Sequence, residues 1–474
     1  MNLRLHLLAA MLSLALMGMP AQAQQPGSSN PLGAPTPTNP QAETPEQAPT
    51  ATNAPVADTR PLSGAEDIGV GLRTRGRNYV LPSLQIYAYG DTNRSLITMG
   101  ETGTELEGSV TGRLAVQHVS RTRQFTMDYM GGGMFYARES SLNATMHAIG
   151  LSQTFTGRRW ALMLGDRASY LPESPFGFGG FGSLDTGLSG VGGAFGMNLG
   201  SLSPAFSMGQ TLVSGRGYRI SNVTLAQIQY NTSARSTITA AASYGLLRFE
   251  ESGLIDSDHR IFTLGYDRNL NRRDSVGVTY GVSMFRFRGL PQAFDDHFVQ
   301  ISYGHRITGR LGFELAGGPE IDKFKSSLTD SSLRYYWNLH SALRYRWPRS
   351  DMALTYSRYT TSGSGLLLGA QTDEIRFSAS RRFTRSWSGS FSPGLSRNAQ
   401  LEETTSSSVH YNTYYVGGGL QRSLGRYTDV SLNYTFQGQM NKSTDAAGVS
   451  INNTLNRHVF GLAVSWHGRQ LEVD

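Results

Sequence analysis

The sequence predicts an all-β fold, a closed antiparallel transmembrane β-barrel of about 18 strands, with 16 as the alternative count. Three observations predict it. Polar and apolar residues alternate with a period of two along most of the chain. The alternating runs are about 10–15 residues long, whereas ordinary strands average about five or six and a tilted strand that crosses a bilayer needs about 9–11. Short and longer connections also alternate, as in bacterial membrane barrels.

The composition suits a membrane barrel better than a soluble domain. The 474 residues include 42 Lys plus Arg and 35 Asp plus Glu, and charged residues make up only 16% of the chain. Soluble domains usually carry about 25%. The basic excess is almost entirely arginine, because lysine occurs only at Lys323, Lys325 and Lys442. The chain has no cysteine, which excludes disulfides and thiolate metal sites.

Two segments precede the expected barrel. Residues 1–23 have Arg4 before an apolar core and end in Ala21-Gln22-Ala23, the pattern of a cleaved secretory signal peptide. Residues 24–61 are rich in Pro, Ala, Thr and Gln and poor in large apolar residues, so we expect a disordered periplasmic linker. The outer-membrane barrel is then expected over 62–474.

Eighteen runs alternate between two faces. The clearest covers 429–439, where Val430, Leu432 and Tyr434 share one face and polar residues occupy the other. A sheet that closes on itself leaves no unpaired edge, which is what a spanning structure in lipid requires. The runs lie near 79–90, 104–118, 123–137, 143–155, 159–170, 221–232, 236–249, 259–268, 274–287, 296–307, 310–322, 332–346, 351–361, 372–383, 386–398, 407–421, 426–440 and 455–467.

The connections predict the topology. Every second connection is tight, as at Thr308-Gly309 and Leu424-Gly425, and most of the others are longer. The short side of bacterial barrels is periplasmic, so an even strand count places both termini in the periplasm. Four tryptophans beside the tight turns are expected to form an aromatic girdle at that membrane edge: Trp160, Trp347, Trp387 and Trp466.

These features together resemble the Gram-negative outer-membrane β-barrel proteins, in particular large porin-like barrels, over roughly 79–467. The final run also resembles the family's C-terminal assembly signal, with Gly461 followed by apolar residues two apart. The resemblance implies an outer-membrane location, contact with outer-membrane lipid and recognition by the barrel assembly machinery through the C-terminal strand. It also implies passive diffusion or solute transport.

The inward face of such a barrel is the candidate functional surface. A barrel of 16 or 18 strands is wide enough for an aqueous channel, and inward arginines would enrich anions. The alternative is that arginine–carboxylate pairs only hold the wall, so we expect any anion selectivity to be modest. The expected pore-lining residues are Arg113, Arg167, Arg334, Arg344, Arg346, Arg376, Arg382, Glu105, Glu107, Glu314 and Glu374, with Asp128, Glu320 and Asp429 as further inward acids.

The connection over 173–222 is by far the longest and is rich in glycine. So long a loop is usually functional or disordered. It would be the third extracellular loop, and the resemblance implies that this loop often folds inward and narrows the pore. The alternative is a surface loop packed on its neighbours. The expected constriction residues are Phe176, Phe178, Phe181 and Asp185.

We expect no catalytic, metal or cofactor site. His147 and Ser152 fall on opposite faces of one run, so they cannot form a nucleophile–base pair. Asp256, Asp258 and His259 near the extracellular rim could form a general-base site, and the alternative that we favour is a solvated polar loop. No metal-ligand spacing occurs. The arginines are spread over turns, which argues against nucleic acid as a partner.

Three functional hypotheses follow. The first is a channel for passive passage of small hydrophilic solutes, anionic ones included. The second is an export channel for an anionic exopolysaccharide, which an arginine-lined lumen would suit. The third is a structural or adhesin-like barrel with a plugged lumen. The sequence determines neither the solute nor the oligomeric state.

Overall fold

The computed structural model describes residues 78–93, 104–138, 140–173, 212, 216–325, 332–401, 408–444, 450–469 and 471–472. They belong to one compact unit, Pro49–Asp474. The expected signal peptide at 1–23 and linker at 24–61 lie outside the described residues. Across the described ranges, none of the helices has the length and hydropathy to span a membrane.

The barrel wall consists of long strands of 12 to 18 residues, which are long enough to cross a bilayer at a tilt. One short 3₁₀ helix, η1 (Ser140–Leu142), precedes β4. The strands are β1 (Tyr79–Asp91), β2 (Glu105–Val119), β3 (Arg123–Tyr136), β4 (Ala144–Thr156), β5 (Trp160–Glu173), β6 (Arg216–Ser233), β7 (Ser236–Phe249), β8 (Ser257–Asn269), β9 (Asp274–Phe287), β10 (Ala293–Arg306), β11 (Leu311–Lys325), β12 (Leu333–Trp347), β13 (Ser350–Thr361), β14 (Ala370–Arg382), β15 (Trp387–Gln400), β16 (Ser408–Ser423), β17 (Thr428–Thr444) and β18 (Ser450–His467), with β19 (Leu471–Glu472) as a two-residue strand.

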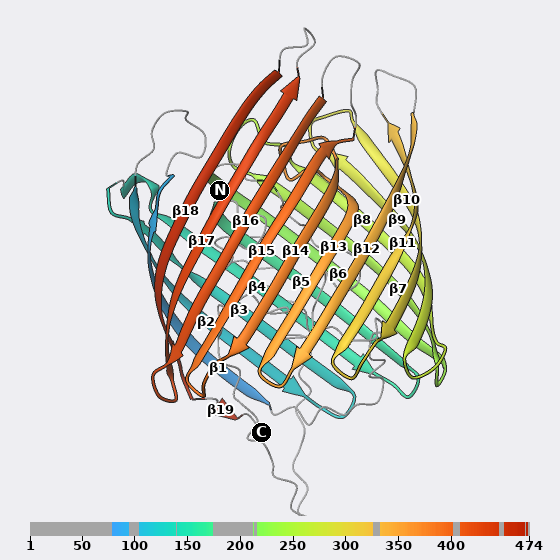
Figure 1. Ribbon diagram of the computed structural model, residues 1–474, viewed down its shortest axis with the longest axis horizontal. Coiled ribbons are helices and arrows are strands. Elements are labelled where there is room, and N and C mark those ends of the chain that lie inside the picture. The colour runs from blue at the N-terminus through green and yellow to red at the C-terminus, as the bar shows by residue number, and fades with distance from the viewer. Residues whose placement is uncertain are drawn as a thin grey trace, which may run out of the picture. The chain divides into compact units, whose positions relative to one another are not determined.

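The sheet closes on itself. Each strand pairs antiparallel with the next, and β1 also pairs with β18 over Ser83–Asp91 and His467–Val459. The two residues of β19 add to the start of β1. Figure 1 shows the resulting tilted barrel. The predicted closed barrel and the count of 18 are therefore confirmed, and 16 is wrong. The largest differences are at β6, which begins at Arg216 and not at 221, and at β18, which begins at Ser450 and not at 455.

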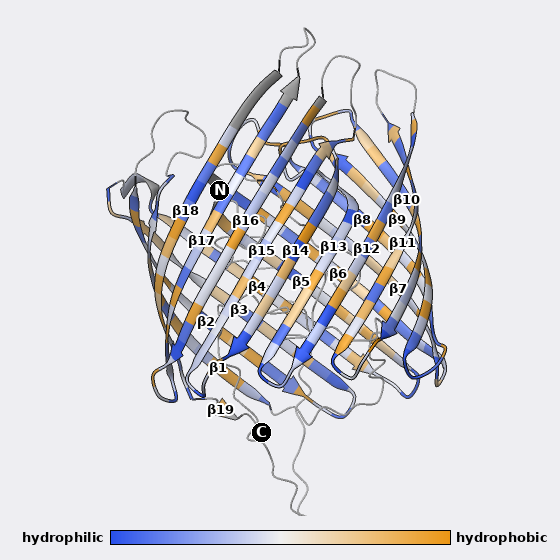
Figure 2. Ribbon diagram, in the orientation of Figure 1, coloured by the Kyte–Doolittle hydropathy of each residue, from blue (hydrophilic) through white to orange (hydrophobic). Residues whose placement is uncertain are grey.

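The two faces of the wall differ in polarity. On β2, Leu106 and Val110 are 61% and 41% exposed, whereas Glu105 and Glu107 are 0% and 2% exposed. The same alternation of polar and apolar residues follows the strands around the barrel (Figure 2). Because the large exposed side chains are apolar and the buried face is polar, the wall is inverted relative to a soluble barrel. Such an outer surface is stable only against lipid.

The two ends of the barrel have different connections. Eight connections of two to four residues, such as 120–122 between β2 and β3, lie at one end, called here the turn end. The opposite end is called the loop end, and both are visible in Figure 1. The four expected girdle tryptophans all lie on strand ends at the turn end and are about half exposed. They are Trp160 at 41%, Trp347 at 54%, Trp387 at 39% and Trp466 at 47%.

An arginine lies over two of these rings. Arg310 lies 5.7 Å from the centre of the Trp347 ring, and Arg422 lies 5.4 Å from that of Trp387. A guanidinium group therefore lies over the face of each of these two rings, a cation–π contact at the membrane interface.

Candidate functional site

The inner wall carries the expected pore-lining residues, and several arginines pair with acids on neighbouring strands. Arg113 Nε on β2 lies 2.6 Å from Asp128 Oδ2 on β3. The Asp128 side chain is fully buried, and that of Arg113 is 23% exposed. The register sets Asp128 opposite Ala115, two residues beyond Arg113 on the same face. The pair is therefore a local contact within the wall, which joins β2 to β3.

Three further arginines are also neutralised within the wall. Arg344 Nη1 lies 3.3 Å from Glu314 Oε2 across β11 and β12, and Arg344 is only 4% exposed. Arg376 Nη2 contacts Glu374 Oε1 at 2.5 Å along β14. Near the turn end, Arg346 Nε lies 3.2 Å from Asp351 Oδ1, and both side chains are about half exposed. Most of the positive charge that was expected to face the lumen is thus balanced by an adjacent carboxylate.

The other expected lining residues lie at different depths. Glu105 Oε1 accepts a hydrogen bond from the Arg138 backbone NH at 2.9 Å. Arg334 Nη1 donates to the Leu401 carbonyl oxygen at 2.5 Å. Arg167 on β5 is half-buried, whereas Arg382 is exposed at the turn-end terminus of β14. Each of these residues has its own local surroundings, so together with the arginine–acid pairs they do not form a single site.

Sequence reasoning missed one ion pair at the closing seam. Arg457 on β18 contacts Asp91 on β1, and both side chains are fully buried. The register pairs Asp91 with Val459, two residues from Arg457, so the contact depends on how the first and last strands meet. Period-two alternation predicts only that each residue faces inward.

At the loop end, the connection between β13 and β14, residues 362–369, contacts two other connections. This segment leaves the wall and reaches the connection between β7 and β8, where the Ile255 backbone NH donates to the Gly365 carbonyl oxygen at 2.9 Å. At its other end, the Leu401 NH donates to the Gly369 carbonyl oxygen at 3.2 Å. The segment, called here the inward loop, therefore crosses part of the barrel opening.

The backbone of the inward loop turns sharply. Gly363, Gly365 and Gly369 have φ values of 83°, 84° and 87°, and Ser364 has a φ of 55°. Residues other than glycine rarely adopt such positive φ values. A Cβ atom on Gly365 would also lie 2.5 Å from the Phe249 ring. Glycine is thus required at 365 both by conformation and by close packing.

The inward loop rests on an apolar cluster that the wall provides. Phe285, Phe287, Phe294 and Phe324 pack with Leu401 on the inner side of β9 to β11, and Leu368 of the loop contacts the cluster. The Phe285 and Phe294 rings stack with centres 4.5 Å apart. Three consecutive leucines at 366–368 were a sequence signal for this arrangement, because a surface loop would expose them to water.

The expected constriction residues Phe176, Phe178, Phe181 and Asp185 lie outside the described residues. One described residue of the same connection, Leu212, is fully buried and packs with Leu367 and Ala370. The long connection therefore contacts the inward loop at that point.

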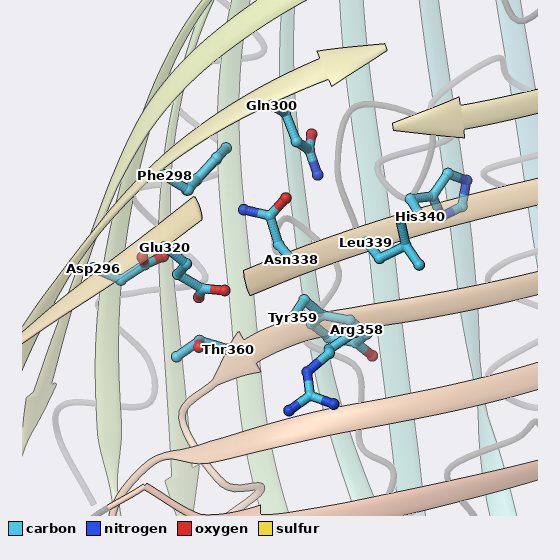
Figure 3. Close-up of a pocket in the computed structure, with 10 residues that line it drawn as sticks. All are labelled: Asp296, Phe298, Gln300, Glu320, Asn338, Leu339, His340, Arg358, Tyr359 and Thr360. Carbon is cyan, nitrogen blue, oxygen red and sulfur yellow. The ribbon is translucent and has the colours of Figure 1, made fainter. Parts of the chain in front are cut away.

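A cavity of about 350 Å³, a volume that includes open solvent, lies on the inner wall between β10 and β13. Its polar lining includes carboxylates, amides and a histidine, and Figure 3 shows the side chains. The His340 Nδ1 atom lies 2.9 Å from the Ser357 hydroxyl oxygen. The lining residues are Asp296, Phe298, Gln300, Glu320, Asn338, Leu339, His340, Arg358, Tyr359 and Thr360.

The structure separates the residues that were weighed as catalytic. His147 lies on the outer face of β4, with Nδ1 3.0 Å from the Tyr129 hydroxyl oxygen. Ser152 is buried on the inner face, 2.6 Å from the Thr126 hydroxyl. Asp258 is paired with Arg248 at 2.6 Å, whereas His259 is 4% exposed and packs against Phe285. His147 and Ser152 therefore form no nucleophile–base pair, and Asp258 and His259, which are adjacent on β8, point to opposite faces of the wall.

No family model matches the sequence, and no curated protein matches it. Solved structures that the fold resembles include Pseudomonas aeruginosa OccK2 (OpdF), with a TM-score of 0.42 and 11% identity over 84% of this chain and 98% of that one. The BenF-like porin from Pseudomonas fluorescens Pf-5 has a TM-score of 0.41 and 9% identity over 84% and 99%. Pseudomonas aeruginosa OpdK with vanillate has a TM-score of 0.40 and 10% identity over 82% and 98%. Likeness at this level carries no argument about family or solute.

Proposed function

We propose that this protein is an outer-membrane channel for the passive passage of small hydrophilic solutes, with its N-terminus in the periplasm. The observation that carries the proposal is the closed wall of 18 strands with apolar side chains outside and polar side chains inside. A barrel of this strand number is wide enough to hold water. Neither an enzymatic role nor a cofactor is part of the proposal, because the weighed catalytic residues are separated.

The inward loop is the proposed gate of this channel. It crosses the loop end and contacts Ile255 on the other side of its span. Leu366, Leu367 and Leu368 pack in apolar clusters with the wall and with Leu212, which hold the loop in its position.

Any anion preference is proposed to be small. Arg113, Arg344, Arg346 and Arg376 each contact a carboxylate within 3.3 Å. The adjacent carboxylate offsets most of the charge of a paired arginine, so the pair contributes little field to a passing ion, and salt screens the remainder. The same pairing makes the inner wall less suited to hold an anionic exopolysaccharide, so export of such a polymer is the weaker alternative.

A second candidate function is a plugged structural barrel. The observation that favours it is the burial of polar groups on the inner wall. Glu105, Glu107, Asp128 and Arg457 are each 0–2% exposed. A wide and open aqueous pore would leave such groups accessible to water.

Conductance in a planar lipid bilayer separates the two candidates. The full-length protein, refolded and verified by heat-modifiable migration, is expected to give stable steps. Deletion of 364–368 is expected to increase the step size, because it removes the segment that crosses the opening. A reversal potential near zero in a salt gradient would agree with the paired arginines. A folded barrel that conducts neither before nor after the deletion would establish the plugged barrel and exclude the channel.

A further inference from the structure

The pairing of β12 with β13 stops before the loop end. The register ends where Leu339 lies opposite Arg358, and positions 333–338 of β12 have no register partner in the described part of β13. Both strands stay paired on their other sides, β12 with β11 as far as Leu333 and β13 with β14 as far as Thr361. The six unmatched residues of β12 span about 20 Å, at about 3.3 Å per residue. The wall is therefore split between these two strands, and the split is called here the lateral gap.

Contacts bound the lateral gap at both ends. Toward the turn end it begins at the pair of Leu339 and Arg358. Toward the loop end, Arg334 Nη1 and the Tyr336 hydroxyl of β12 donate to the Leu401 carbonyl oxygen at 2.5 and 3.3 Å. Leu401 follows β15, so these contacts tie β12 to the end of β15 past β13 and β14, which lead into the inward loop. The gap is therefore a bounded window in the wall.

The cavity described above lies in the lateral gap. It is lined by three consecutive residues of β12, at 338–340, and by three of β13, at 358–360. Successive side chains of a strand point to opposite faces of the sheet, so a cavity on one face would be lined mainly by alternate residues. The cavity thus lies between the facing edges of the two strands and reaches both faces of the wall. Figure 3 shows the side chains of both strands around it.

Lipid-facing side chains surround the outer side of the gap. Leu333, Tyr335 and Trp337 of β12 are 56%, 75% and 47% exposed. The Arg358 guanidinium lies 4.5 Å from the centre of the Trp337 ring and pairs with Asp373 at 3.2 Å. Aromatic side chains mark the membrane interface of such barrels. The gap therefore opens sideways toward the membrane, and the cation beside it is already neutralised.

The gap also contains polar groups that need partners. Asn338 is 5% exposed, and neither its amide nitrogen nor its amide oxygen has a hydrogen-bond partner among the residues that the structure describes. Its side chain projects into the cavity in Figure 3. A buried amide left unpaired is costly, and an open strand edge is tolerated at membrane depth only where it is covered by protein or lines a water-filled cavity. The contents of the gap must therefore donate and accept hydrogen bonds.

We propose that the lateral gap binds a small neutral amphipathic molecule with a hydroxyl group, held between the lumen and the membrane. The hydroxyl group donates to the Asn338 amide oxygen or accepts from the amide nitrogen, and the apolar body lies beside Leu339 and the lipid-facing side. The Asp296 and Glu320 carboxylates line the same cavity and disfavour an anion. The proposal goes beyond the channel function and does not depend on it, because it needs only the folded barrel in lipid.

Paired cysteines test whether the gap exists, and the chain has no native cysteine that would interfere. Tyr336 and Thr361 would lie opposite each other if the register continued. Tyr336→Cys with Thr361→Cys, folded in lipid vesicles, is expected to form no disulfide on mild oxidation, because a disulfide needs Cα atoms within about 7 Å. Ala342→Cys with Thr355→Cys is the matched control, a register pair of the same two strands, and is expected to form one. An equal yield of disulfide in the two variants would overturn the lateral gap.

Tryptophan quenching tests the ligand, because Trp337 lies at the outer side of the gap and bromine quenches tryptophan fluorescence on contact. The probe is a medium-chain alcohol with a bromine at its far end, added to the folded barrel in lipid vesicles. The signal of Trp337 is the difference between the wild type and Trp337→Phe. We expect saturable quenching by the bromoalcohol, weaker quenching by the bromocarboxylate of the same length, and quenching without saturation by the bromoalkane, which only dissolves in the lipid. Equal quenching without saturation by the alcohol and the alkane would overturn the site.

Asn338→Leu assigns the binding to the amide. It keeps the size of the side chain and removes both hydrogen-bonding atoms, so we expect the bromoalcohol to bind about threefold to tenfold more weakly, the effect of one ordinary hydrogen bond. Asn433→Leu is the matched control, an inward asparagine on β17 whose amide donates to the Ser431 hydroxyl oxygen, and is expected to leave the binding unchanged. Wild-type affinity in Asn338→Leu would overturn the assigned contact. Failure of the channel proposal would instead appear as absent conductance with saturable quenching intact.

Discussion

Arg457 on β18 and Asp91 on β1 form a fully buried ion pair at the seam where the first and last long strands close the barrel. The same Asp91 carboxylate accepts a hydrogen bond from the Asn93 backbone NH at 3.0 Å. Removal of one partner of a buried pair leaves an uncompensated charge, whereas removal of both does not. The pair therefore couples barrel closure to the presence of two residues that lie 366 positions apart in the sequence.

We predict that Arg457→Met destabilises the barrel by about 3–5 kcal/mol, because the buried Asp91 carboxylate is left unpaired. The double variant Arg457→Met with Asp91→Asn is predicted to regain most of that loss. Urea-dependent folding into lipid vesicles, followed by tryptophan fluorescence, measures both. A double variant as unstable as the single one would show that the pair does not act as a unit.

A second prediction compares two arginines on the inner wall of β12. Arg344 is 4% exposed and pairs with Glu314, whereas Arg346 and its partner Asp351 are about half exposed. Arg344→Met is expected to cost about 3 kcal/mol, since it strands a largely buried acid. Arg346→Met is expected to cost about 0–1 kcal/mol, because water and salt screen an exposed pair. Equal losses in the same urea titration would argue that burial does not govern these pairs.

The third prediction tests which face of the wall contacts lipid. Ile301 lies in the middle of β10 and is 68% exposed, and the adjacent Ser302 faces inward. Ile301→Arg is expected to destabilise the barrel by about 2–4 kcal/mol, the cost of a basic side chain on the lipid face near the bilayer midplane. Ser302→Arg, the matched control on the same strand, is expected to have a small effect in lipid vesicles. The reverse order would invert the assignment of the two faces.

Most of the fold was predictable from the sequence, because the length of each run and its period of two identify a membrane-spanning strand and its two faces. The run that includes Val430, Leu432 and Tyr434 alternates without interruption, and its strand, β17, contains the whole predicted run 429–439 and extends to Thr444. The start of β6 was missed because Arg216-Gly217 opens the strand with a charge and a glycine, which resemble the end of a loop. Pairing with β5 extends the strand there, through Glu173 and Arg216.

The contacts within the candidate site were less predictable. Alternation places Asp322 and Glu320 on the inward face, but it leaves open which residue of β10 lies opposite them. Only the register brings Asp296 to Asp322. The inward loop depends likewise on a contact between Gly365 and Ile255, which belong to connections that are distant in the sequence. Relations between distant segments decide the chemistry of this site, and a local pattern does not contain them.

The last prediction addresses the gate, and it depends on the proposed channel. Gly365→Leu is expected to increase single-channel conductance, because a side chain at 365 would collide with Phe249 and carry an unfavourable φ of 84°. The loop should then leave its position across the opening while the strands stay paired. Gly289→Leu is the matched control, since Gly289 has a φ of 76° but nothing within 4 Å of an added Cβ. Both variants carry about 1–3 kcal/mol of backbone strain, and only the first disturbs the contact with Phe249. If both variants changed the conductance equally, the cause would be backbone strain in the loops in general. If neither variant changed the conductance, the inward loop would not be the constriction.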